Sequence, residues 1–450
     1  MGALWQTDSH KAEADSPSPA PLPKKFRPPR PWRRLFWLIL LLVLLALGFA
    51  VLREMHSARW QARTLSQWAA QLTYRVEPGA SDAILYPGAG PFDQRLGYSA
   101  LGDFLPRLLK RNYVIESQAR FSAALMNYSR HGLFIPYAEK IQAGLSITDC
   151  RAAPLYQFNY PTQLYAQFSD VPPLMVRSLL FIENRELLDP QPAQANPAVD
   201  WPRFAKAAWS QVARQLHLPG QTAGGSTLAT QLEKYRHSPD GLTLSGSEKL
   251  RQMLSASVRA YQHGPDTLLA RQNVVRDYLN SVPLSAVPGH GEVHGMAEGL
   301  RVWYGADFNQ VNRALADTTN TAPSLAARGL ALRQVLSLMI AQRRPSHYLT
   351  KGRDELAQLT DSHLRLLAQQ GVIEPGLLKA ALASQVTYRD WQQQPTTQKH
   401  EATTVISVPR SHPARQYVRA DKNTAFCPRH GADLVFRRAV LQDLSLSAGL

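Results

Sequence analysis

The sequence predicts a mainly α-helical protein behind a single N-terminal transmembrane helix. Two observations lead to this fold class. Residues 35–52 form one uninterrupted apolar run, LFWLILLLVLLALGFAVL. Between about residues 160 and 385, apolar residues recur at helical spacing in one segment after another, while strand-like runs are few.

The apolar run is about as long as a helix must be to cross a bilayer core of roughly 30 Å. The basic stretch PKKFRPPRPWRR comes directly before it and predicts a cytoplasmic N-terminus, with the rest of the chain outside the inner membrane. A cleaved signal peptide is the alternative. The long N-terminal preamble and the lack of a clean small-x-small cleavage site favour an uncleaved, single-pass anchor.

The length of 450 residues and the content of 44% hydrophobic and 19% charged residues fit a globular protein with more than one folded part. The pattern divides the chain into a disordered basic cytoplasmic tail (1–34), a transmembrane anchor (35–52), a connecting or pedestal region (53–150), a helical domain (151–385) and a polar tail or linker (386–450).

The formal net charge is +16, which suits an anionic partner such as a membrane surface or a pyrophosphate, and equally fits a solvated basic surface. No Walker A loop, zinc-type Cys/His cluster or RNA-binding signature appears, so a nucleic-acid partner is not expected. The two cysteines, Cys150 and Cys427, could form a disulfide in an oxidising compartment, but two unpaired thiols are favoured.

The segment GGSTLATQLEK, residues 224–234, carries the clearest chemistry. Its two glycines permit a tight turn, and Ser226 or Thr227 can cap the helix that follows. Thr227, Gln231 and Lys234 then share one helix face near a helix N-terminus, where a hydroxyl, an amide, an ammonium and the helix dipole suit a pyrophosphate. The alternative is a capped surface helix with an ordinary polar face.

This segment resembles the pattern GGSTxxxQQLxKN of the peptidoglycan glycosyltransferases, glycosyltransferase family 51, which comprises class A penicillin-binding proteins and monofunctional transglycosylases. Further similar segments follow the family order: FSDVPPLMVRSLLFIENREL, DYLNSV, GMAEGL with WYGAD, LSLMIAQRRPSHY and LRLLAQQGVIEPGLLKAAL. The resemblance covers roughly residues 160–385. It implies a lysozyme-like helical domain that polymerises lipid II by inverting transfer, with release of undecaprenyl pyrophosphate.

The resemblance also implies partners and site residues. The partners are lipid II, the growing glycan chain, the inner membrane and a cell-wall synthesis complex, with the bulk of the chain in the periplasm. A divalent cation, Mg²⁺ or Mn²⁺, is allowed at the pyrophosphate, but no metal ligand is assigned. Glu183 is the implied base. The implied substrate-binding residues are Asn184, Ser226, Thr227, Gln231, Lys234, Lys249 and Asn280.

Among the positions that depart from the family pattern, two bear most on catalysis. Asn184 stands where the first motif has Asp, and Gln252 stands where the third motif has a second catalytic Glu. Glu248 lies one helical turn before Gln252 and could replace it, and Glu186 could partly compensate at the first motif. A neutral amide cannot carry the charge of a carboxylate. An active glycosyltransferase is therefore weighed against a catalytically weakened lipid II-binding or scaffold protein, and against a lysozyme-like enzyme that cleaves glycans.

Two further activities are weighed from motifs. The segment GHGEVHG, residues 289–295, places His290 and His294 around Glu292, but its glycines favour a loop over a metal site. No Ser-x-x-Lys motif is followed by Ser-x-Asn and Lys-Thr-Gly, so peptidoglycan crosslinking is not predicted from these residues.

Overall fold

The computed structural model describes residues 30–390, except 88–89, 111, 138, 140, 149–153, 202, 204, 207–208 and 211–225. The chain divides into two compact units, residues 1–53 and 54–450, and each is described by itself. Cys150 and Cys427 lie outside the described residues, as do residues 1–29 and most of the predicted tail. The disulfide alternative and the predicted domain boundaries therefore stay predictions.

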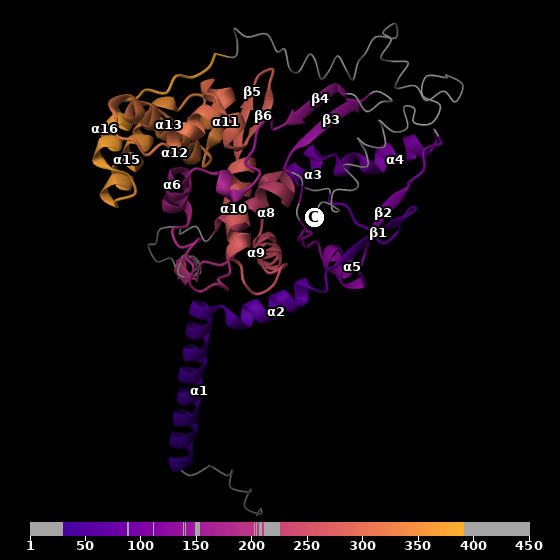
Figure 1. Ribbon diagram of the computed structural model, residues 1–450. Helices are drawn as coiled ribbons and strands as arrows, with labels where there is room; N and C mark the ends of the chain where they lie inside the picture. Colours follow the sequence, from indigo (N-terminus) through magenta and orange to yellow (C-terminus); the bar gives the residue numbers. More distant parts are fainter. Residues whose placement is uncertain are drawn as a thin grey trace, which may run out of the picture. The chain divides into compact units, whose positions relative to one another are not determined.

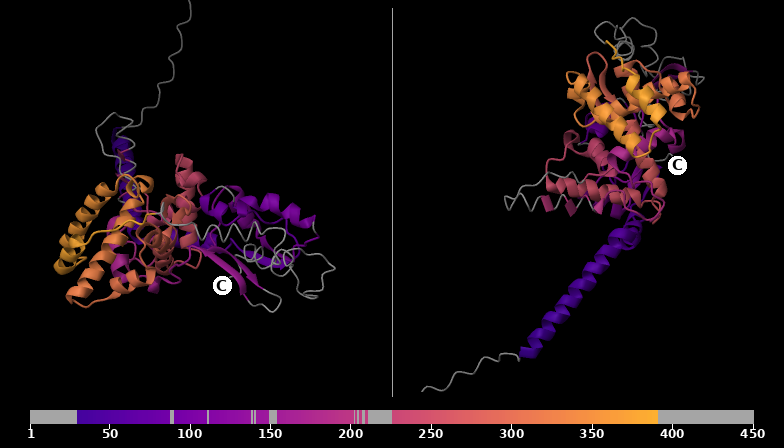
Figure 2. Two further views of the ribbon diagram at one scale, coloured as in Figure 1. Left: turned by 90° about the horizontal axis from the view of Figure 1, so that it is seen from above. Right: turned by 90° about the vertical axis from the view of Figure 1, so that its left-hand side faces the viewer.

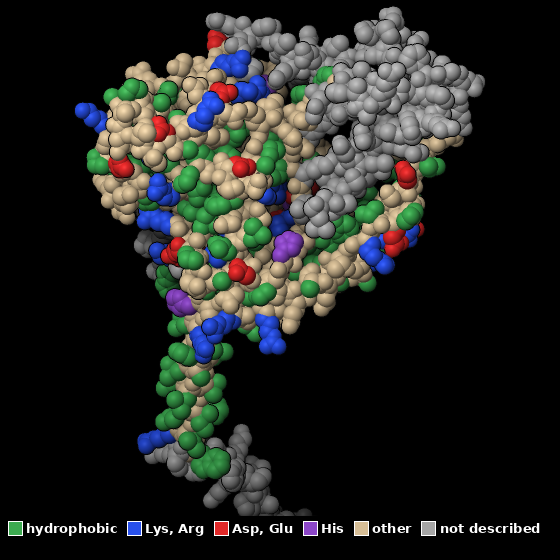
Figure 3. Space-filling model, in the orientation of Figure 1, with side chains coloured by type: hydrophobic (Ala, Val, Ile, Leu, Met, Phe, Trp, Pro, Cys, Tyr) green, Lys and Arg blue, Asp and Glu red, His purple; other side chains and the backbone are tan. Residues whose placement is uncertain are grey.

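The N-terminal apolar run is helical, as predicted. Helix α1 extends over Arg30–Ser57, and its stretch Arg34–Ser57 is long and apolar enough to cross a membrane. Its leucine, isoleucine, valine and aromatic side chains are exposed over this length, as the space-filling view shows (Figure 3). An exposed apolar surface of this kind is compatible with a single-pass anchor.

Helix α2 (Arg59–Ala69) is amphipathic and is a helix separate from α1. Ala58 interrupts the backbone with φ 50°, in the left-handed region that an alanine rarely adopts. The carboxylate of Glu54 then accepts hydrogen bonds from the backbone N–H groups of Trp60 (3.1 Å) and Gln61 (2.9 Å). It therefore satisfies donors that the first turn of a helix leaves free.

The region after α2 is a small mixture of helices and strands (Figure 1). Strand β1 (Tyr74–Pro78) pairs antiparallel with β2 (Ser117–Phe121), with Tyr74 opposite Phe121. The helices are α3 (Pro91–Arg95), the 3₁₀ turn η1 (Tyr98–Ala100), α4 (Leu101–Leu109) and α5 (Ala123–Arg130). A second hairpin, β3 (Ala143–Thr148) and β4 (Pro154–Tyr160), leads into the helical part.

The helical part begins with η2 (Phe168–Asp170) and contains most of the helices that the spacing of apolar residues predicts. Within the described residues they are α6 (Pro173–Glu183), α8 (Leu228–His237), α9 (Gly246–Ala260), α10 (Leu268–Ser281), α11 (Gly295–Tyr304), α12 (Phe308–Ala316), α13 (Ala322–Ala341), α14 (Pro345–Tyr348), α15 (Arg353–Gln369) and α16 (Pro375–Ala383), with η3 (Pro239–Gly241) after α8. The described part of the chain is mainly helical, which confirms the predicted fold class. Figure 2 shows these helices from two further directions.

Helix α13 is the centre of the hydrophobic core. It is apolar enough to resemble a membrane span, but most of it is buried inside the protein. Leu332, Val335, Leu336 and Leu338 are fully buried in the largest apolar cluster, together with residues of α6, α8, α10 and α11. Residues 331–341 of this helix are buried on all sides, which explains why apolar residues predominate there without a polar face.

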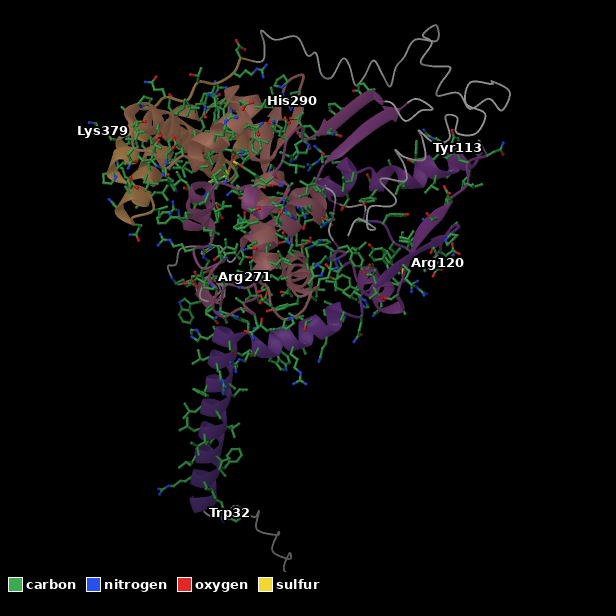
Figure 4. The ribbon with its side chains drawn as sticks, viewed as in Figure 1. Trp32, Tyr113, Arg120, Arg271, His290 and Lys379 are labelled. Carbon is green, nitrogen blue, oxygen red and sulfur yellow. The ribbon has the colours of Figure 1, made fainter. Side chains whose placement is uncertain are left out.

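The segment GHGEVHG contains more regular structure than the predicted loop. Strand β5 (Pro283–Val287) pairs antiparallel with β6 (Gly291–His294), so this stretch is a β-hairpin. His290 lies at its turn (Figure 4). The reason is that Gly289 and Gly291 take the positive φ values, 78° and 96°, that a tight turn between two strands requires.

The region before residue 150 packs closely against α8 and α9. The backbone of Gly90, which precedes α3, lies against the end of α8: a Cβ atom at this position would approach the carbonyl oxygen of Arg236 to 2.1 Å. A side chain does not fit there, so glycine permits the contact. Leu125 and Tyr128 of α5 are buried with Val258 of α9 in a second apolar cluster.

Candidate active site

Glu183 is the last residue of α6, and two features fix its position. Leu174, Met175 and Leu179 bury one side of the helix in the core. At its C-terminal end, the guanidinium of Arg203 donates to the backbone carbonyl of Glu183 (2.6 Å) while it pairs with Asp200 (3.1 Å). A cation at this end satisfies a free carbonyl and opposes the negative end of the helix dipole.

The carboxylate of Glu183 accepts one hydrogen bond on each oxygen. The side-chain amide of Gln231, on α8, donates to Oε2 (3.1 Å), and that of Gln342, the residue after α13, donates to Oε1 (3.1 Å). Residues 48 and 159 positions away from Glu183 therefore meet at one carboxylate. Two donors on two oxygens restrict the rotation of the carboxylate.

The hydroxyl of Tyr235 lies on the far side of both amides. It is 3.2 Å from Oε1 of Gln231 and 3.0 Å from Oε1 of Gln342. Burial, followed by the charge of Glu183, raises the pKa of Tyr235 above its ordinary value. The hydroxyl therefore keeps its proton and remains a hydrogen-bond donor.

Two lysines lie in the same region. The ammonium of Lys234, on α8, lies over the ring of Tyr235, 4.5 Å from its centre. Lys249, on α9, donates to the hydroxyls of Ser226 (2.9 Å) and Thr230 (3.3 Å).

Burial and the charge of Lys234 lower the pKa of Lys249 to about 8. Burial also lowers the pKa of Lys234, an effect that the charge of Glu183 opposes. Two close ammonium groups that lack a full solvent shell favour an anion between them.

Thr227 is the N-cap of α8, which confirms the predicted cap. Its side chain accepts from the backbone N–H of Thr230 (3.3 Å), while the hydroxyl of Thr230 accepts from the N–H of Thr227 (2.9 Å). This reciprocal box starts the helix and leaves Thr227 only 1% exposed, while Ser226 is exposed. The phosphate-binding roles of both residues stay predictions. Gln231 and Lys234 are the two members of the predicted face that lie beside Glu183.

Gln252 and Glu248, both on α9, belong to a separate polar cluster around Ser238, at the C-terminal end of α8. The amide of Gln252 donates to the hydroxyls of Ser238 (2.9 Å) and Thr243 (3.0 Å), and its side chain is fully buried. The hydroxyl of Ser238 donates to Glu248 (2.5 Å), which also pairs with Arg251 (2.8 Å). The predicted catalytic roles of Gln252 and Glu248 stay predictions.

The remaining predicted site residues lie at the end of α6 or contact the backbone of another segment. Asn184 is the C-cap of α6, and Glu186 is exposed in the turn that follows, because the helix ends at Glu183. Asn280, on α10, is buried, and its amide exchanges hydrogen bonds with the backbone of Tyr165 (2.8 and 2.9 Å). Substrate binding by Asn184 and Asn280 stays a prediction.

The segment after Glu183 is held by Arg271 of α10. This buried guanidinium donates to the carbonyls of Leu187 (3.0 Å), Asp189 (2.7 Å) and Ala193 (3.4 Å), and Figure 4 shows it at the base of the helical part. One side chain thus satisfies three carbonyls of an irregular stretch, which keeps the chain next to Glu183 in place.

Within the described residues, no group of three His, Cys, Asp or Glu side chains is placed to hold a metal ion. His294 pairs with Glu292 (2.9 Å), whereas His290 faces the carboxylate of Glu298 (3.7 Å). Lys234 and Lys249 bring positive charge to the candidate active site, which disfavours a bound divalent cation.

Three residues of this site were not singled out from the sequence. Gln342, Tyr235 and Arg203 contact Glu183 or its amide partners, but each lies in a segment that shows only a helical pattern. Tyr235 directly follows Lys234, and its position beside a predicted phosphate ligand was the one signal available.

Comparison with known proteins identifies a family over the stretch of chain that contains this site. The family model described as transglycosylase matches residues 151–369, which include Glu183, α8 and both lysines. None of the curated proteins compared with the chain matches it. Over residues 151–369 the chain is therefore a transglycosylase domain of glycosyltransferase family 51, the domain of peptidoglycan transglycosylases.

Proposed function

We propose that this protein polymerises lipid II into glycan strands, with release of undecaprenyl pyrophosphate from the donor. One observation carries the proposal: a carboxylate held by two amides, Glu183, shares a site with two partly buried ammonium groups, Lys234 and Lys249. A base and an anion clamp are the two groups that this transfer needs.

In the proposed reaction, Glu183 takes the proton of the 4-hydroxyl of an incoming lipid II. That oxygen bonds to the anomeric carbon of the growing chain, and the bond from this carbon to the pyrophosphate oxygen breaks. Attack from the face opposite the leaving group inverts the carbon. Lys234 and Lys249 stabilise the negative charge that develops on the pyrophosphate.

The proposed location follows from the substrates. Both are lipids, and α1 has the length and composition of a membrane anchor. The basic stretch before it supports a cytoplasmic N-terminus in the inner membrane, with the transglycosylase domain in the periplasm. In this location the protein would act within a cell-wall synthesis complex.

The test is polymerisation of labelled lipid II by the purified full-length protein in detergent. Glu183→Gln keeps the size of the side chain and removes the base, so we expect the rate to fall at least about 100-fold while lipid II binding is retained. Glu374→Gln is the matched control, since Glu374 is exposed before α16 and its side chain makes no capping hydrogen bond. Equal rates for wild type and Glu183→Gln would contradict the proposal.

A second candidate function is a lipid II-binding or scaffold protein with little turnover. Gln252 favours it, because an amide stands where the family pattern has a second catalytic carboxylate. In this case wild type and Glu183→Gln both bind lipid II and neither forms polymer. A glycan-cleaving activity would instead release soluble fragments from preformed peptidoglycan, and the paired lysines argue against it.

A further inference from the structure

Gln342 and Tyr235 complete a closed set of hydrogen bonds around Glu183 that reaches beyond the residues named by the family motifs. We infer that these two are positioning residues, which hold the Glu183 carboxylate in one orientation for proton abstraction. This inference rests on the proposed function, in which Glu183 is the base. It adds that loss of these hydrogen bonds lowers the turnover rate and does not change the affinity for substrate.

The first step of the argument is the geometry of the carboxylate. Each of its oxygens accepts from a different glutamine, at 3.1 Å in both cases. Gln231 comes from α8 and Gln342 from the C-cap of α13, the central core helix. A carboxylate tied at both oxygens to two helices cannot turn away from the site without losing a hydrogen bond.

The second step concerns the orientation of the amides. A glutamine amide has a donor end and an acceptor end, and only its donor end suits an ionised carboxylate. The hydroxyl of Tyr235 faces Oε1 of both glutamines, at 3.2 and 3.0 Å, and its raised pKa keeps it protonated. The hydroxyl has a single hydrogen and gives it to one glutamine at a time, and in that glutamine Tyr235 favours the orientation in which Nε2 points to Glu183.

The third step concerns what Tyr235 contributes apart from its hydroxyl. The ammonium of Lys234 lies over its ring, 4.5 Å from the ring centre. Tyr235→Phe keeps this ring and removes only the hydroxyl, so it tests the hydrogen-bond set without removing the support of Lys234. Gln342→Leu has a similar size and removes one donor to Glu183.

The experiment measures kcat and KM for lipid II with the full-length protein. We expect kcat to fall about tenfold in Gln342→Leu and several-fold in Tyr235→Phe, with KM within about twofold of wild type, since a misplaced base slows chemistry without changing ground-state binding. Gln370→Leu is the matched control, because Gln370 is the exposed C-cap of α15 and should leave both constants unchanged.

A coupling measurement separates positioning from general stability. The shorter carboxylate of Glu183→Asp no longer reaches both amides, so Gln342→Leu should cause little further loss in that background.

Each other outcome identifies what fails. If wild type forms polymer and both variants match it, the positioning role is wrong and the proposed function stands. A raised KM in Gln342→Leu or Tyr235→Phe would show a merely structural role. The same conclusion would follow if the loss of kcat in Gln342→Leu added fully to the loss in Glu183→Asp. If wild type forms no polymer, the proposed function fails and the positioning role fails with it.

Discussion

Two glutamine side chains lie near opposite ends of α8, Gln231 on α8 itself and Gln252 on α9. They face different groups. Gln231 donates to the ionisable Glu183, whereas Gln252 donates to the neutral hydroxyls of Ser238 and Thr243. The hydroxyl of Ser238 gives its single hydrogen to Glu248. Ser238 therefore has no hydrogen left for a carboxylate at position 252.

The substitution Gln252→Glu tests whether a family-type carboxylate can work at this position. One of its oxygens would face the lone pairs of Ser238 in a fully buried place, so we expect a loss of stability of about 2–4 kcal/mol and no gain in polymerisation rate. Thermal unfolding and lipid II kinetics measure both. Gln358→Glu, on the exposed side of α15, is the control. A faster, equally stable Gln252→Glu enzyme would contradict this account.

Lys249 predicts a pH limit on activity. Burial, with the charge of Lys234, lowers its pKa to about 8, so its ammonium loses its proton in the free enzyme as the pH rises through that value. We expect kcat/KM for lipid II to decline above about pH 8, because kcat/KM reports groups of the free enzyme.

The control for this prediction replaces Lys249 with a side chain whose positive charge does not change in this pH range. Lys249→Arg keeps its charge to much higher pH, so its decline should move upward or disappear. Lys351→Arg, at an exposed position, should behave like wild type. An unchanged decline in Lys249→Arg would assign the pH limit to another group.

Helix α8 is the element on which the site depends, and buried charges hold its C-terminal end. His237 lies between Asp93 (2.8 Å) and Glu139 (2.6 Å), both from the region before residue 150. Arg236 pairs with Glu139 (3.2 Å) and with Asp277 (3.3 Å) of α10. The capping box fixes the first turn of α8 and these ion pairs fix the last, so the register of Gln231 and Lys234 is set from both ends.

Arg259 of α9 extends this cluster to the backbone. It pairs with Glu233 of α8 (2.7 Å) and donates to the carbonyls of Tyr137 (2.5 Å) and Ile135 (2.8 Å). The segment around Glu139 is thereby fastened to both α8 and α9. Burial alone would raise the pKa of Glu139, but the charges of His237, Arg259 and Arg236 outweigh it and lower that pKa.

The same cluster predicts how stability depends on pH. Burial alone would lower the pKa of His237, but the charge of Glu139 and the hydrogen bonds that the ring donates to Asp93 and Glu139 raise it to about 10. A histidine with a raised folded-state pKa stabilises the fold fully below its unfolded value near 6.5, and this contribution is lost as the pH rises toward 10. We expect the melting temperature to fall across this window.

Variants show whether His237 causes the fall. In His237→Gln the dependence between pH 7 and 10 should flatten and the protein should be less stable at pH 7, as unfolding curves at a series of pH values would show. His131→Gln removes an exposed histidine and should reproduce the wild-type curve. A His237→Gln curve parallel to wild type would exclude this histidine as the cause.

At the scale of the whole molecule, the folded unit that holds the site together includes residues outside the matched transglycosylase domain. Asp93, Glu139 and the close contact at Gly90 precede residue 151, yet they bury charge and backbone against α8. Residues 1–53, in contrast, form a separate compact unit. The region after α2 therefore contributes to the stability of the domain.

A truncated protein beginning at Glu54 tests this division. Glu54 remains to cap α2, so we expect the melting temperature to stay within about 2 °C of the full chain, while binding to lipid vesicles is largely lost. A second truncation beginning at residue 151 removes the partners of His237 and should unfold at a much lower temperature. Equal stability of both truncations would contradict the role given to the region before residue 151.

Prediction from sequence succeeded where a property is local. Helices α6, α8, α9, α10, α13, α15 and α16 follow from apolar spacing, and Thr227 caps α8 as its residue type and position indicate. Residues 289–295 were expected as a loop, although they include strand β6, because the strand is too short and the segment too rich in glycine for a periodic pattern.

The sequence alone predicted the apolar helix before residue 58, the mainly helical fold, the transglycosylase motif, and Glu183 and Lys234 as candidate site residues. Which groups surround that glutamate depends on the tertiary structure. Gln342 lies 159 residues from Glu183 and Tyr235 lies on α8, and no periodicity connects them. Helix formation depends on neighbours within a few residues, whereas the hydrogen bonds of an active site depend on how whole helices pack against one core.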